Sequence, residues 1–161
     1  MNFRELIEGK NEMPTNDTDG IYMCVKFTQE TNENLYDFAK SLGLDPIEPE
    51  KLHATVVYST DPLDMPHGAK PCNGECFTTG LKYLGEKDSK WRALVLEVQS
   101  DKLQELYDEA VEEYGYVSQY DSYVQHISLA YKPPEDLDLS DIILPDFPIE
   151  IDKIVVEPLK V

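Results

Sequence analysis

The sequence predicts an α+β domain over residues 1–161, built from two similar lobes of mainly antiparallel sheet, each with one packed helix. Two observations support this fold class. The order strand, helix, connection, strand occurs twice, over approximately residues 20–60 and 91–132. Each copy ends in a His-x-Thr/Ser phrase, "LHATVVYS" and "QHISLAY". The recurrence of a whole unit indicates an internal duplication. We therefore expect pseudo-symmetric lobes whose histidine strands face a central cleft.

The first copy follows a helical or loose lead-in and the turn-forming stretch "MPTNDTDG". The apolar run Ile21–Phe27 predicts a buried strand. In "TQETNENLYDFAKSLG" the apolar residues recur at helical spacing, which predicts a helix capped by Thr31 and ended by Gly43. The stretch "KLHATVVYST" then predicts the strand that carries the first histidine.

The second copy has the same order of elements at similar spacing. The run Trp91–Gln99 predicts a strand, and "SDKLQELYDEAVEEYG" predicts a helix that ends at Gly115. The strand "VQHISLAYK" follows. The first histidine lies ten positions after Gly43, and the second lies eleven positions after Gly115.

The remaining segments connect or extend these copies. "TDPLDMPHGAKPCNGEC" is rich in Pro and Gly, which predicts a loop, and "CFTTGLKYLG" predicts an extra strand. "KPPEDLDLSDIILPDFP" predicts an acidic connection, and "IEIDKIVVEPL" a final strand.

The formal net charge of −18 disfavours proteins that follow the backbone of long nucleic acids, which need a basic surface. It does not disfavour a small anion held by a few donors. Only the segment 81–92 is locally basic, with four cations and two anions. This segment is either a solvated hairpin end or a local contact for an anion.

No apolar run reaches the length of a membrane span, and the charged start has no signal-peptide character. With three cysteines, an odd number, we expect no disulfide framework and a reducing cytoplasm. The spacing of His67, Cys72 and Cys76 raises the question of zinc, but no fourth ligand lies at a usual spacing. We expect no metal there, and instead a mobile loop over the cleft.

Two histidines and two hydroxyls carry the candidate chemistry. Side chains at i and i+2 of a strand share a face, so His53 lies with Thr55 and His126 lies with Ser128. One imidazole can accept a proton and the other can donate one, while the hydroxyls hold phosphate oxygens. This chemistry needs no metal or cofactor. For a single copy, a partly buried structural histidine is the alternative; the matched pair favours catalysis.

The paired motifs on duplicated β–α units resemble the two-histidine (2H) phosphoesterase superfamily over essentially the whole chain. That resemblance implies catalytic roles for His53, Thr55, His126 and Ser128. Within the superfamily the chain resembles the phage anti-CBASS nucleases, through a "GIYMCVKF"-like strand and "LHATVVYS". This implies hydrolysis of cyclic di- and trinucleotides, such as 3′,3′-cyclic GMP-AMP, in the cytoplasm of a host cell. Long nucleic acids and membranes are not expected partners.

Three further residues are candidates for substrate binding. Tyr22 and Trp91 begin the first strands of the two copies, where each either rims the cleft or packs in the core. Glu157 either accepts from a purine edge or is a surface carboxylate. Tyr58 and Tyr131 lie an odd number of positions from their histidines, which predicts that they point into the core.

Two other functions stay open. One is an RNA-end enzyme of the same superfamily that opens 2′,3′-cyclic phosphates; the acidic charge counts against a large RNA partner. The other is a protein that sequesters a nucleotide without cleaving it, for which a pair of acid–base histidines has no use.

Overall fold

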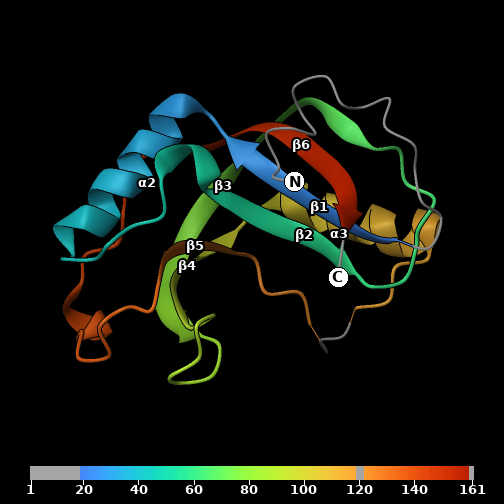
Figure 1. Ribbon diagram of the computed structural model, residues 1–161. Coiled ribbons are helices and arrows are strands. Elements are labelled where there is room, and N and C mark those ends of the chain that lie inside the picture. The colour runs from blue at the N-terminus through green and yellow to red at the C-terminus, as the bar shows by residue number, and fades with distance from the viewer. Residues whose placement is uncertain (1–18, 119–121, 160–161) are drawn as a thin grey trace.

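The computed structural model describes residues 19–118 and 122–159, which form an α+β fold of two helices and an antiparallel sheet (Figure 1). The predicted fold class is therefore confirmed at this level. The predicted lead-in and most of "MPTNDTDG" lie outside the described residues. The elements are β1 (Gly20–Phe27), α2 (Gln29–Ser41), β2 (His53–Ser59), β3 (Gly68–Leu84), β4 (Ala93–Gln99), α3 (Asp101–Tyr114), β5 (His126–Tyr131) and β6 (Ile149–Leu159), with short 3₁₀ turns at Pro49–Lys51 and Leu139–Asp141.

The described strands form one six-stranded sheet in the order β2-β1-β6-β3-β4-β5. Every neighbouring pair is antiparallel. The two strands that begin with histidine, β2 and β5, are therefore the outermost strands of the sheet. They also contact each other, so the sheet curves until its two ends approach. This curvature brings together two segments that are far apart in the sequence.

One buried apolar cluster holds the helices against the sheet. Helix α2 contributes Leu35 and Ala39, and α3 contributes Leu103, Leu106 and Ala110, as their helical spacing predicts. In Figure 1, α3 lies behind β1 and β2. Each helix also contacts the histidine strand of the other half of the chain: α2 contacts β5, and α3 contacts β2. Among the described residues, no helix has the length and apolar character to span a membrane.

The start of α2 corrects one prediction. Thr28, not Thr31, is the N-cap, and its hydroxyl oxygen accepts from the backbone N–H of Thr31 at 3.3 Å. Thr31 is buried, and its Oγ1 accepts from the backbone N–H of Glu150 at 3.1 Å, which ties the helix to β6. The predicted end holds: Gly43 follows the cap residue with a φ of 81°, a conformation that glycine adopts without a steric penalty.

Strand β3 corrects a second prediction. Residues 68–76 were expected in a loop, but they pair with β6, and residues 77–84 pair with β4. The register shifts between Pro71 and Gly74, so the turn-forming residues lie at an irregularity inside a strand. The prediction of a mobile loop over the cleft is therefore wrong for this segment. Similarly, the strand predicted from Trp91 begins at Ala93, and Trp91 lies in the preceding turn.

The cap of α3 provides a test of the fold. Ser100 is 2% exposed, and its hydroxyl oxygen accepts from the N–H of Leu103 at 3.3 Å. We expect Ser100→Ala to lower the free energy of unfolding by about 1 kcal/mol, because a buried N–H loses its cap. Urea unfolding followed by circular dichroism measures this change. Ser41→Ala, at an exposed hydroxyl in the last turn of α2, is the control and should change stability little. Equal stability of Ser100→Ala and the control would contradict this role.

Candidate active site

The two histidine strands present the same pattern of burial. On β2, His53 and Thr55 are half-buried, and the residue between them is buried. On β5, His126 and Ser128 are half-buried, again with a buried residue between them. The four polar side chains thus lie on the strand faces turned away from the apolar core. Because β2 and β5 contact each other, the two pairs belong to one region of the molecule.

Both strands carry a bulge at the same place. In the pairing of β2 with β1 the register skips Val56 of β2, and in the pairing of β5 with β4 it skips Leu129 of β5. A bulge residue reverses the alternation of faces beyond it. Tyr58 and Tyr131 therefore return to the face of the histidines, where they are 48% and 45% exposed. The prediction that these tyrosines pack in the core was wrong, because counting by twos assumes a regular ladder.

The two imidazole rings are held in the same way. Nδ1 of His53 lies 2.8 Å from the carbonyl oxygen of Lys51, and Nδ1 of His126 lies 2.9 Å from that of Val124. A carbonyl only accepts, so Nδ1 is the donor in both rings. Nε2 is then the nitrogen that takes a proton from a substrate, or gives one when the ring is charged.

Tyr22 lies beside the first pair. Its hydroxyl is 2.8 Å from Oγ1 of Thr55, and its ring meets the ring of His53 edge-on, with 6.3 Å between the centroids. It is directly opposite Tyr58 on β2 and Glu157 on β6. Burial raises the pKa of Tyr22 well above its usual value, so the phenol stays protonated. The structure thus brings Tyr22 and Glu157 together with His53 and Thr55.

Glu157 is an unusual carboxyl group on this face. Its Oε2 is buried and has no hydrogen-bond partner among the described residues. Burial raises its pKa to about 7, against the opposing effect of the Lys26 ammonium. Near neutral pH the group is therefore part neutral acid, which donates a hydrogen bond, and part carboxylate, which accepts one.

Two lysines near the site were not predicted. Lys26 is directly opposite His53 on β2 and Lys153 on β6, and both lysines are half-buried. The sequence held a usable signal: Lys26 is four positions from Tyr22 on one strand and so shares its face. The pKa of His53 is lowered, first by burial and then by Lys26 and His126, while the carbonyl of Lys51 opposes this. The two histidines are thus close enough to influence each other.

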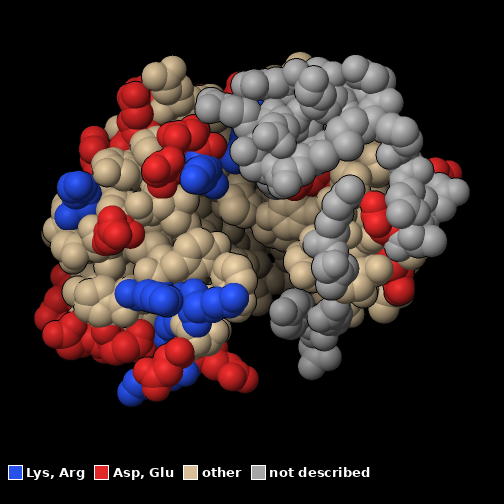
Figure 2. Space-filling model, viewed as in Figure 1, with Lys and Arg blue, Asp and Glu red and all other residues tan. Residues whose placement is uncertain are grey.

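Trp91 lies beside Tyr131, the last residue of β5. Its ring meets Tyr131 edge-on at 6.2 Å, and Nζ of Lys90 lies 5.1 Å from its centroid. The indole is 65% exposed. Figure 2 shows basic side chains gathered over the β3–β4 connection, next to a hollow in the middle of this face. Ion pairs engage Lys82 and Arg92 of this basic segment, with Glu97 and Glu135 respectively.

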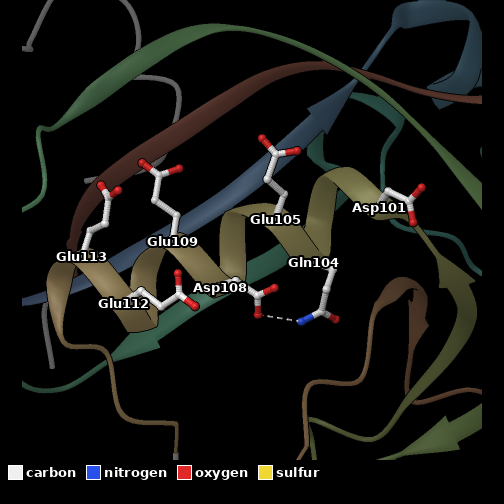
Figure 3. A pocket seen from close by; sticks show the side chains of 7 residues that line it. All are labelled: Asp101, Gln104, Glu105, Asp108, Glu109, Glu112 and Glu113. Carbon is white, nitrogen blue, oxygen red and sulfur yellow. Dashed lines mark hydrogen bonds between the residues drawn. The ribbon is translucent and has the colours of Figure 1, made fainter.

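A depression of about 470 Å³ lies elsewhere, along the outer side of α3. Its side chains project from the helix away from the buried stripe (Figure 3). Apart from Gln104, its lining residues are carboxylates: Asp101, Glu105, Asp108, Glu109, Glu112 and Glu113. Such a surface repels anions, so it does not suit a phosphodiester.

The three possible zinc ligands lie in or just before strand β3. Cys72 and Cys76 lie within β3, where Cys76 is buried, and His67 precedes the strand. Burial raises the pKa of the Cys76 thiol to about 11, which disfavours the thiolate that metals bind. In residues 19–118 and 122–159, no three His, Cys, Asp or Glu side chains are grouped to hold a metal ion.

Comparison with known proteins identifies the family. The model of the family described as "Anti-CBASS protein Acb1" matches residues 19–161. The chain belongs to this family. One relative, the anti-CBASS protein Acb1 of Escherichia phage RB16, is 35% identical over 114 residues, which are 70% of this chain and 63% of that protein. The Acb1 protein of Vibrio phage KVP40 is 26% identical over 137 residues, which are 81% of this chain and 80% of the relative. The chain thus spans less than two thirds of the first Acb1 relative.

The carboxyl group of Glu157 gives a pH-dependent prediction. Its folded-state pKa of about 7 lies above the ordinary value of 4.5. The folded protein then binds more protons than the unfolded chain between these values, so this group's stabilising effect is lost as pH rises through 7. We expect Glu157→Gln to raise the melting temperature more at pH 8 than at pH 5. Glu150→Gln, at an exposed position on β6, is the control. A pH-independent difference would contradict the raised pKa.

Proposed function

We propose that this chain is a metal-independent phosphodiesterase that cleaves 3′–5′ bonds of cyclic di- and trinucleotides, such as 3′,3′-cyclic GMP-AMP, and so counteracts CBASS signalling. The observation that carries the proposal is the repetition of one arrangement. A His-x-Thr/Ser pair, a bulge and a carbonyl contact to Nδ1 recur on β2 and β5. The relatives named as anti-CBASS proteins support the biological role.

The repetition also supports a pseudo-symmetric origin for the site. Against β1, the partners of His53, Thr55 and Tyr58 are Lys26, Cys24 and Tyr22. Against β4, the partners of the corresponding residues occur in the same order and with the same skipped position. We infer that each lobe supplies one histidine and one hydroxyl, and that the scissile phosphate binds between them, as in 2H phosphoesterases.

The proposed reaction needs two proton transfers. A neutral imidazole takes the proton of the substrate's 2′-hydroxyl through Nε2, and the 2′-oxygen attacks phosphorus. The bond to the 5′-oxygen breaks, and the other imidazole, charged at the start, protonates that oxygen. The product ends in a 2′,3′-cyclic phosphate. Water opens this ring in a second step, in which the two imidazoles reverse their roles.

The hydroxyls hold the negative charge that develops on the phosphate oxygens. Tyr22 positions one of them. When the Tyr22 phenol donates to Oγ1 of Thr55 across their 2.8 Å contact, the hydrogen of Thr55 is directed elsewhere and can reach a phosphate oxygen. Ser128 occupies the corresponding position on β5. In this proposal the two hydroxyls hold the phosphate oxygens directly.

The aromatic residues suit the two bases of such a substrate. Tyr58 on β2 meets Tyr22 edge-on, and Tyr131 on β5 meets Trp91 edge-on. Each lobe thus offers exposed aromatic surface on the site face, on which one base can stack. Glu157 can bind a purine edge as donor or acceptor, because its pKa lies near neutrality.

The first test is product formation in the presence of EDTA. We expect the protein to convert 3′,3′-cyclic GMP-AMP to linear products without added metal, because imidazoles and hydroxyls supply the chemistry. Liquid chromatography of the products measures this, with oligonucleotides ending in 2′,3′-cyclic phosphate as parallel substrates. Intact cyclic dinucleotide that remains bound would indicate sequestration. Turnover of the RNA ends alone would indicate the RNA-end enzyme.

The second test is substitution of the histidines. We expect His53→Ala and His126→Ala each to lower turnover at least about 100-fold, the lower range for loss of a general acid or base. The chain offers a matched control, because its third histidine, His67, precedes β3 and is not part of the proposed site. His67→Ala should keep nearly the full rate. A nearly unchanged rate in either of the first two variants would refute the two-histidine mechanism.

A further inference from the structure

The turn that carries Trp91, between β3 and β4, is tightly built. The N–H of Trp91 donates to Oγ of Ser89 at 3.0 Å, and the N–H of Arg92 donates to the carbonyl oxygen of Ser89 at 3.0 Å. At the start of the turn, Gly85 adopts a φ of 90°, and a Cβ there would lie 3.0 Å from the carbonyl oxygen of Trp91. The two ends of the turn therefore pack backbone against backbone.

The guanidinium of Arg92 binds several groups around this turn. Its Nε and Nη2 donate to the two carboxylate oxygens of Glu135 at 3.3 and 3.0 Å, and its Nη1 donates to the carbonyl oxygen of Gly85 at 2.6 Å. Its Cζ lies over the ring of Tyr83, 4.8 Å from the ring centre, and the Tyr83 hydroxyl donates to the carbonyl oxygen of Pro134 at 2.7 Å. The planar fork of an arginine can make these contacts together, whereas the single ammonium of a lysine cannot.

These contacts join the turn to the segment that follows β5. Glu135 lies in that segment, four positions after the end of the strand at Tyr131. The backbone N–H of Lys132 also donates to the carbonyl oxygen of Arg92 at 2.8 Å. Lys132 directly follows Tyr131, as Arg92 directly follows Trp91. The same set of bonds therefore holds the two residues whose rings meet edge-on, with 6.2 Å between the ring centroids.

This pair of rings is close to the first half of the proposed site. Burial is the main reason that the pKa of Tyr22 is raised, and the nearby Tyr131 phenol contributes to the rise. The Tyr22 hydroxyl in turn contacts Oγ1 of Thr55 at 2.8 Å. Trp91 is 65% exposed and Tyr131 is 45% exposed, so a ligand can reach both rings. A ring that is already held in place loses less conformational entropy when it binds a base.

We propose that Arg92 and Glu135 are positioning residues. They hold Trp91 against Tyr131, so that the two rings together bind one base of the cyclic nucleotide. This inference rests on the proposed function. Arg92 acts through the turn, because its Nε, Nη1 and Nη2 atoms already donate to Glu135 and to the carbonyl oxygen of Gly85. Loss of this positioning weakens the binding of substrate and transition state alike, which raises KM and leaves kcat nearly unchanged.

The positioning can be measured without any ligand. The chain contains one tryptophan, so tryptophan fluorescence reports on Trp91 alone. Time-resolved fluorescence anisotropy of the free protein measures how freely the indole moves. We expect Arg92→Lys, which keeps the charge, and Glu135→Ala, in a surface turn, each to increase the amplitude of fast indole motion. Circular dichroism of each variant shows whether it is folded, and Glu135→Ala tests the same clamp if Arg92→Lys does not fold.

Binding is measured separately from cleavage. In a His53→Ala background, quenching of Trp91 fluorescence by 3′,3′-cyclic GMP-AMP should give a Kd about tenfold higher when Arg92→Lys is added, in the range for loss of one stacked base. In the otherwise unchanged protein, Arg92→Lys should raise KM about tenfold and keep kcat within about twofold. Lys87→Met is the matched control, because it removes a charge from an exposed position of the same turn. It should leave the indole motion, Kd and KM near their wild-type values.

The inference is overturned if Arg92→Lys and Glu135→Ala both leave the fast motion of Trp91 unchanged. It is also overturned if Arg92→Lys leaves Kd and KM at their wild-type values; a rise in both with Lys87→Met instead would indicate attraction by charge alone. If the wild type neither binds nor cleaves a cyclic nucleotide, the proposed function fails, while the anisotropy of the free protein still tests whether Arg92 holds Trp91.

Discussion

The fold depends on the way in which each half of the chain covers the exposed sheet edge of the other half. The strands β2 and β5 end the sheet, so their outer backbone groups need partners. The N–H of Ile47, in the connection after α2, donates to the carbonyl of Leu129 on β5 at 2.8 Å. In return, the hydroxyl of Tyr123, before β5, donates to the carbonyl of Thr55 on β2 at 2.8 Å. The helices make the same kind of contact, because α2 packs on β5 and α3 packs on β2. Each histidine strand is thus held in place by the other half of the chain.

These cross-copy bonds fall at the two bulges, and the bulges determine what the site contains. The carbonyls of Thr55 and Leu129 lie next to or at the skipped positions, where the ladder is interrupted. A bulge there turns Tyr58 and Tyr131 onto the face of the histidines. Regular strands would direct both rings toward the core and remove them from the face of the histidines. The same irregularity therefore provides the bonds that join the copies and the aromatic surface that suits nucleotide bases.

Local patterns in the sequence predicted most elements, because apolar spacing and helix ends act over a few residues. The position of His53 and Thr55 on one face of β2 is also predictable locally. Both residues precede the bulge, so the regular alternation of faces still holds between them. Features that depend on partner strands were missed. Tyr58 lies beyond a bulge that only the register with β1 reveals, and β3 absorbs Pro71 within a strand because β6 supplies its pairing. Lys26 was missed for a similar reason: its importance arises from the residue opposite it, not from its neighbours in the chain.

The charge distribution follows from the same registers. The chain carries 32 acidic and 14 basic residues, yet Lys26 and Lys153 are directly opposed on the site face. Like charges in this position destabilise a sheet, and the pKa of Lys26 is lowered by burial and by Lys153. A dianionic substrate would relieve this repulsion on binding, whereas the carboxylates along α3 would repel it elsewhere. The acidic exterior disfavours long polyanions, because a long backbone must cross it, and under the proposed function the lysines on the site face would attract a small anion.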